Sequence, residues 1–167
     1  IRESNDGMTR DLHASRHVTW NGNAFTTNQW GMRDREYSLE KPAGTLRIAL
    51  LGPSHVMGNG VADGETFESL IEERLNRELH LPGVEHFEIL NFGVDGYSMP
   101  QEVALLEDRV LKFKPDVVIA THYHQDRAMT GEYLLKLVLR HVQAPDPVIA
   151  DLLVGAGMAD YARGDLP

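Results

Sequence analysis

Ser54 is the first residue of this sequence whose position suggests covalent chemistry. It follows the apolar run LRIALLG at 46–52 and the turn residue Pro53. A serine directly after a buried strand can point its hydroxyl off the edge of a sheet while its own N–H faces a cavity. An acyl-transfer nucleophile and one oxyanion donor have these requirements. Taken alone, however, the stretch favours an ordinary turn serine or a helix cap.

A glycine-rich segment, NFGVDGYS at 91–98, also follows an apolar run. Gly96 in this segment could offer a bare backbone N–H to a developing oxyanion. A turn that leads into a helix near Pro100 would explain the same residues without any chemistry.

The segment THYHQDR at 121–127 carries two histidines and an aspartate. His122 and His124 are two residues apart, so they share a face if the segment is extended. His-x-His-x-Asp, here His122, His124 and Asp126, is a metal-ligand pattern that resembles the signature of metallo-β-lactamase-fold hydrolases. Those hydrolases need further His and Asp ligands far downstream, where His141 is the only remaining histidine. They also need a series of β-hairpins upstream, whereas this chain offers parallel βα units. Histidines that hydrogen-bond at the edge of the sheet are therefore the favoured interpretation, and a metal site is the less favoured alternative.

These three segments are expected to meet because strands and helices alternate from residue 45 onward. Strands are predicted over 46–52, 87–93 and 116–124, and helices over 65–79, 100–113, 130–142 and 145–158. The short connections favour right-handed parallel crossovers, hence an α/β fold, a three-layer sandwich with a parallel sheet. The ligand site of such a sheet lies beyond the carboxyl ends of its strands.

The residues before this alternation form a different kind of segment. Residues 17–30 mix β-forming residues with an Asn-Gly pair at 21–22, which predicts a β-hairpin. We therefore divide the chain into an N-terminal extension, 1–44, and an α/β domain, 45–167. Arg33 and Arg47 are expected to be surface or ion-pair residues.

The composition is typical of a folded globular protein and limits its partners. The 167 residues are 42% hydrophobic and 25% charged, with a net charge of −9 and no cluster of Lys and Arg. A nucleic-acid backbone is therefore not an expected partner. The absence of cysteine excludes disulfides, thiolate zinc sites and a cysteine nucleophile. No apolar stretch approaches the roughly 20 residues of a membrane span.

Together, the three segments resemble the blocks of the SGNH (GDSL-type) esterases and acyltransferases. The stretch at 28–67, NQWGMRDREYSLEKPAGTLRIALLGPSHVMGNGVADGETF, is similar to the entry segment of a bacterial subgroup. The resemblance implies a flavodoxin-like fold, a hydrolase or acyltransferase acting on ester bonds, and no cofactor or metal. It also implies that Ser54 is the serine nucleophile, Gly96 the second oxyanion donor and Gln125 the third.

The chain departs from the family pattern at three places. Pro53 stands where the family has Asp, and Gln125 stands where it has Asn. No Asp-x-x-His motif, which supplies the family's base and orienting acid, occurs after residue 126. A missing C-terminal part of the domain, a loss of catalysis, or a local base at His124 or His122 would each explain this departure.

The sequence thus predicts a serine esterase or acyltransferase that acts on a small-molecule or carbohydrate O-acyl ester through a Ser54 acyl-enzyme. One alternative is a catalytically inactive SGNH-like binding or accessory domain of a bacterial envelope or polysaccharide system. The other is a metal-dependent hydrolase that uses His122, His124 and Asp126. The subgroup resemblance implies an extracytoplasmic location, periplasmic or membrane-anchored, and the oligomeric state is left open.

Overall fold

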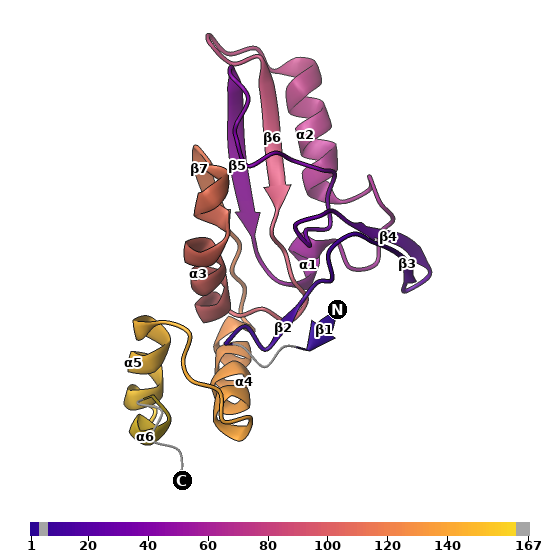
Figure 1. Cartoon of the computed structure of the whole chain (residues 1–167). Helices are drawn as coiled ribbons and strands as arrows, with labels where there is room; N and C mark the ends of the chain where they lie inside the picture. Colours follow the sequence, from indigo (N-terminus) through magenta and orange to yellow (C-terminus); the bar gives the residue numbers. More distant parts are fainter. Residues whose placement is uncertain (4–6, 163–167) are drawn as a thin grey trace.

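A parallel three-stranded sheet forms the centre of the chain in the computed structural model, which describes residues 1–3 and 7–162. The strands β5 (Thr45–Leu51), β6 (His86–Asn91) and β7 (Val117–Ala120) lie in the order β6-β5-β7, so β5 is the middle strand (Figure 1). Residues 4–6 of the predicted N-terminal extension and 163–167 of the predicted α/β domain lie outside the described residues.

Helices connect the strands and continue after them. They are α1 (Ser54–Met57), α2 (Phe67–Glu78), α3 (Met99–Asp108), the 3-10 helix η1 (Val110–Phe113), α4 (Asp126–Leu139), α5 (Pro147–Gly155) and α6 (Ala159–Ala162). Local sequence explains where they begin: the Thr66 side chain accepts the Ser69 N–H at the start of α2, and Pro100 occupies the first turn of α3. None of the described helices is long and apolar enough to cross a membrane.

The two faces of the sheet are covered by different helices because side chains alternate along each strand. On one face, Leu50 of β5 packs in a cluster with Leu75 of α2. On the other face, Ala49 and Leu51 lie in a cluster with Leu105 of α3. The chain therefore has the layered α/β fold with a parallel sheet that its sequence predicts.

An antiparallel hairpin precedes the sheet. Strands β3 (Arg16–Trp20) and β4 (Asn23–Thr27) pair around Asn21 and Gly22, whose φ angles are 50° and 82°. A positive φ at both turn residues is what an Asn-Gly hairpin requires. Two shorter strands, β1 (Arg2–Glu3) and β2 (Arg10–Asp11), also pair antiparallel.

The first 44 residues contribute side chains to the core of the sheet. Leu12, Phe25 and Tyr37 lie in one buried cluster with Ala49 of β5 and Leu90 of β6. The N-terminal residues therefore pack directly on the strands that carry the predicted site.

Arg33 and Arg47 are ion-paired and buried. Arg47 on β5 is fully buried; its Nε donates to Glu88 Oε2 at 2.7 Å, and its Nη1 donates to the Phe113 carbonyl at 2.8 Å. Arg33 is 3% exposed and donates to the Val61 carbonyl at 2.7 Å. Both side chains hold segments of the fold together, because buried guanidinium groups need several acceptors.

β7 is shorter than predicted. The strand predicted over 116–124 ends at Ala120, and all four of its residues are exposed. It forms one edge of the sheet, and no strand in the described part of the chain pairs with its outer side.

The chain turns directly after β7. The carboxylate of Asp126 accepts the Tyr123 N–H at 2.8 Å, and the Asp126 N–H donates to the Tyr123 carbonyl at 3.1 Å. The helix predicted to begin at 130 therefore starts at Asp126. His124 consequently lies in this turn and His122 directly before it, and neither is, as predicted, in the strand.

Candidate functional site

Backbone hydrogen bonds hold the carboxyl ends of the three strands together. The Val94 N–H, after β6, donates to the Gly52 carbonyl at 3.1 Å. The Thr121 N–H, after β7, donates to the Leu51 carbonyl at 3.0 Å. The segments after β6 and β7 therefore flank the residues that lead to Ser54, and Figure 1 shows α1 at this end of the sheet.

Asn91 and Gly93 fix α1 against the end of β6. The fully buried Asn91 amide donates to the Val56 carbonyl and to Glu68 Oε2, both at 2.8 Å. A Cβ on Gly93 would lie 2.3 Å from the Met57 nitrogen, so this close packing requires glycine. The residue types of Asn91 and Gly93 alone do not predict this role. The sequence signal that could have found them is their location directly at the end of a strand.

Ser54 is the first residue of α1 and is half-buried. Within the described residues, neither its hydroxyl nor its backbone N–H has a hydrogen-bond partner. The preceding Pro53 has no N–H and supplies no side-chain cap. In the described part of the chain, both polar groups of Ser54 therefore lack a hydrogen-bond partner.

Gly96 and Gln125 lie beyond the ends of β6 and β7. Gly96 has a φ of 74°, and its N–H has no acceptor in the described part of the chain. Gln125 is exposed at the N-cap position of α4. Across the described residues, no hydrogen bond or ion pair joins Ser54, Gly96 and Gln125 to one another. A cavity of about 100 Å³ is lined by Gly96 but not by the other two.

His122 has a carboxylate partner. Its Nδ1 lies 3.4 Å from Asp126 Oδ2. The His124 ring is exposed and packs edge-on against the Tyr123 ring, with 5.7 Å between the ring centroids. A carboxylate at Nδ1 fixes the orientation of an imidazole and leaves Nε2 to act as a base.

His55, the neighbour of Ser54, contacts the segment after β7. Its Nε2 lies 2.9 Å from the Thr121 hydroxyl, and its ring packs edge-on against Tyr123 at 5.6 Å between centroids. His55 therefore connects α1 to the residues on either side of His122.

Glu102 is a buried carboxyl group close to Asp126. It is 3% exposed, and its Oε2 has no hydrogen-bond partner among the described residues. Burial, followed by the charge of Asp126, raises the pKa of Glu102 to about 7. A proton on Glu102 removes its repulsion with Asp126, so protonation stabilises the contact between α3 and the start of α4.

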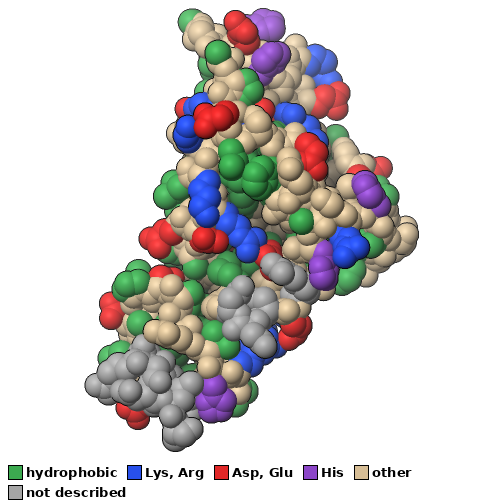
Figure 2. Space-filling view, in the orientation of Figure 1, with side chains coloured by type: hydrophobic (Ala, Val, Ile, Leu, Met, Phe, Trp, Pro, Cys, Tyr) green, Lys and Arg blue, Asp and Glu red, His purple; other side chains and the backbone are tan. Residues whose placement is uncertain are grey.

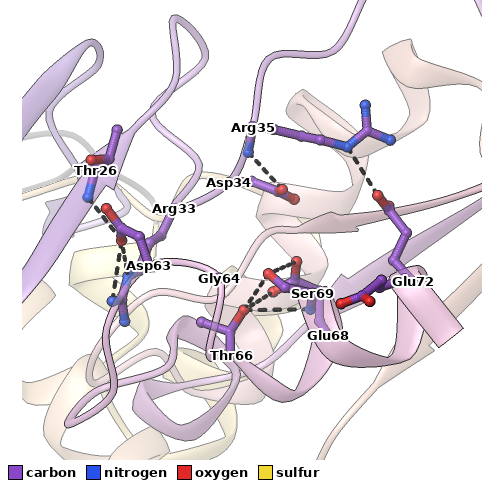
Figure 3. Close-up of a pocket in the computed structure, with 11 residues that line it drawn as sticks. Thr26, Arg33, Asp34, Arg35, Asp63, Gly64, Thr66, Glu68, Ser69 and Glu72 are labelled. Carbon is purple, nitrogen blue, oxygen red and sulfur yellow. Dashed lines mark hydrogen bonds and ion pairs between the residues drawn. The ribbon is translucent and has the colours of Figure 1, made fainter.

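A second cavity, of about 600 Å³, lies beside α2 (Figure 3). Charged side chains line it: Arg33, Asp34, Arg35, Asp63, Glu68, Glu72 and Glu73. Its carboxylates have partners within the protein. Asp34 Oδ2 accepts the Asn91 N–H at 2.9 Å, and Glu72 Oε1 accepts from Arg35 at 2.9 Å. Burial, and then the charge of Glu68, raises the pKa of Asp34 well above its ordinary value. These carboxylates therefore hold β6 and α2 against the segment that contains Asp34 and Arg35.

The described residues contain no group of three or more histidine, aspartate or glutamate side chains placed to hold a metal ion. His122, His124 and Asp126 therefore do not form the ligand set that their spacing suggested. The turn directs His122 toward Asp126 and leaves His124 against Tyr123. The metal-dependent alternative has no site in this part of the chain.

No protein-family model, no curated protein and no solved structure matches the chain. The described residues form an α/β protein in which Ser54, without a hydrogen-bond partner among them, follows the carboxyl end of the middle strand.

Proposed function

We propose that the chain is a serine esterase or acyltransferase of the SGNH type, in which Ser54 becomes acylated. One observation carries this proposal. Ser54 follows the carboxyl end of the middle strand, and its hydroxyl and N–H have no partner among the described residues. Ligand sites of parallel α/β sheets lie at this end of the strands.

In this mechanism Ser54 Oγ attacks the carbonyl carbon of an ester. The carbonyl oxygen becomes an oxyanion, and the N–H groups of Ser54 and Gly96 are its donors, with the Gln125 amide as the third. The ester C–O bond then breaks and the alcohol leaves with a proton. Water, or the hydroxyl of an acceptor, takes the acyl group from Ser54.

His122 is the proposed base. Its imidazole takes the proton from Ser54 Oγ and later gives it to the leaving alcohol. The carboxylate of Asp126 near Nδ1 supports this role, because it stabilises the imidazolium that forms. His124 has no comparable carboxylate partner among the described residues, which is why we prefer His122.

The proposed substrate is a small-molecule or carbohydrate O-acyl ester, and the proposed location is extracytoplasmic. The charge of −9 and the absence of a Lys/Arg cluster in the sequence fit such a substrate better than a nucleic acid.

The test of this proposal is the time course of para-nitrophenyl acetate cleavage. We expect a burst of nitrophenol comparable to the protein concentration, followed by slower turnover, because an acyl-enzyme accumulates. Ser38→Ala, which changes an exposed serine outside the site, should leave the burst unchanged. Release at the buffer rate by folded protein would contradict the proposal and favour the non-catalytic SGNH-like alternative.

A further inference from the structure

The cavity beside Gly96, which we call the Gly96 pocket, is built from three separate parts of the chain. Its volume is about 100 Å³. Its walls include Thr9 and Arg10 from the N-terminal segment, Gly96 and Gln101 after β6, and Glu132 and Lys136 on α4. A water molecule takes up roughly 30 Å³ of liquid. The pocket therefore has room for a group of a few heavy atoms.

Two cationic side chains of the Gly96 pocket have unused donors. Arg10 Nη1 donates to the carbonyl and the carboxylate of Asp95, at 3.1 and 3.3 Å. Its Nε and Nη2 have no acceptor in the described part of the chain. The ammonium of Lys136 has no ion-pair partner there either, although Glu132 is one helical turn away.

Among the described residues that line the Gly96 pocket, cationic side chains outnumber carboxylates, unlike in the protein as a whole. The chain carries a net charge of −9, yet the described lining of the pocket includes Arg10 and Lys136 and a single carboxylate, Glu132. Asp95, which pairs with Arg10 Nη1, is not one of these lining residues. Guanidinium and ammonium donors bind carboxylate and phosphate oxygens through charge-assisted hydrogen bonds.

Gly96 connects this pocket to the proposed chemistry. A Cβ on Gly96 would lie 2.5 Å from Arg10 Nη1, so the guanidinium packs directly on this glycine. Gly96 is thus both a proposed oxyanion donor and part of the wall of the pocket that Arg10 lines.

We infer that the Gly96 pocket binds a small oxyanion group, a carboxylate or a phosphate, and that the preferred ester carries such a group a few bonds from its carbonyl. The statement about the ester rests on the proposed function. The statement about anion binding does not, and the two are tested separately.

The binding test is a titration with inorganic phosphate, followed through the amide resonance of Gly96 at constant ionic strength in sodium chloride. We expect a saturable shift. Lys136→Gln should weaken the binding at least about tenfold, since it removes a charge-assisted hydrogen bond. Lys112→Gln, an exposed lysine on η1 that lies outside the pocket, should bind phosphate like the wild type. A shift that does not saturate, or that is equal in Lys136→Gln, would overturn the inference.

The substrate test compares three esters: para-nitrophenyl acetate, which is neutral; para-nitrophenyl hemisuccinate, with a carboxylate on the acyl side; and para-acetoxybenzoate, with a carboxylate on the alcohol side. We expect one anionic ester to have a kcat/KM at least about tenfold above that of the neutral one, and Lys136→Gln to abolish this preference. The anionic ester with the higher kcat/KM shows whether the anion binds on the acyl side or on the alcohol side of the carbonyl.

The outcomes separate the two proposals. Cleavage that depends on Ser54 with equal kcat/KM for all three esters would overturn the inference and leave the proposed function standing. Saturable phosphate binding without cleavage of any ester would support anion binding in the Gly96 pocket and overturn the proposed function.

Discussion

Replacing Ser54 by alanine is expected to lower the rate of ester cleavage about a thousandfold or more, to the level that the site retains without its nucleophile. The reason is that no other serine follows the carboxyl end of the middle strand. The measurement is the steady-state release of para-nitrophenol by purified Ser54→Ala protein, with the initial burst recorded on the same sample.

The fold should survive this substitution. The Ser54 hydroxyl makes no hydrogen bond within the described residues, so its removal leaves no buried group unpaired. We expect the free energy of unfolding to change by less than about 1 kcal/mol. Ser38→Ala is the matched control, and its activity should equal that of the wild type. Equal activity in Ser54→Ala would show that Ser54 is not the nucleophile.

Glu102→Gln is expected to remove a large part of the pH dependence of stability. Burial and the charge of Asp126 raise the pKa of Glu102 from 4.5 to about 7 in the folded state. The folded state therefore binds more protons than the unfolded state between these values. The stabilising effect of this proton is complete below pH 4.5 and is lost as the pH rises through about 7. The loss corresponds to about 3 kcal/mol.

Denaturant unfolding of the wild type and of Glu102→Gln at a series of pH values measures this effect. The variant, which resembles the protonated side chain, should be more stable than the wild type by up to about 3 kcal/mol at about pH 8, and the difference should shrink toward pH 4. Glu107→Gln, an exposed residue of the same helix, should follow the wild type. The raised pKa values of Asp34 and Glu68 also make the free energy of unfolding depend on pH. This contribution should be the same in the wild type and in both variants. Parallel curves for Glu102→Gln and the wild type would contradict the assignment.

The elements around the middle strand could be predicted from the sequence because their signals are local. The apolar run at 46–52 gives β5, and the helical spacing of apolar residues at 65–79 gives α2. The Asn-Gly pair at 21–22 gives the hairpin turn. Each of these patterns depends only on residues that are close in sequence.

Features that depend on distant partners could not be predicted in the same way. Arg47 lies inside an apolar run and is buried because Glu88 stands directly opposite it in the parallel register of β5 and β6. The turn after β7 depends on the Asp126 carboxylate, which accepts the Tyr123 N–H. Tertiary contacts decide these positions, and periodicity does not report them.

The candidate site likewise contains positions that could be predicted from the sequence and positions that could not. Ser54, Gly96 and Gln125 come after β5, β6 and β7 in the sequence, so their positions beyond these strands could be predicted. Asn91 and Gly93, which fix α1, become visible only when β6 and α1 are seen in contact. The preference for His122 over His124 likewise needs the turn that brings Asp126 to its ring.

The most direct measurement of the central claim is the identity of the residue that a fluorophosphonate probe modifies at neutral pH. We predict one adduct per chain, found by peptide mass mapping on the peptide that contains Ser54 and absent from Ser54→Ala. Folded protein that carries no adduct while a control serine esterase reacts, or an adduct on another residue such as Ser38, would contradict the claim that Ser54 is the nucleophile.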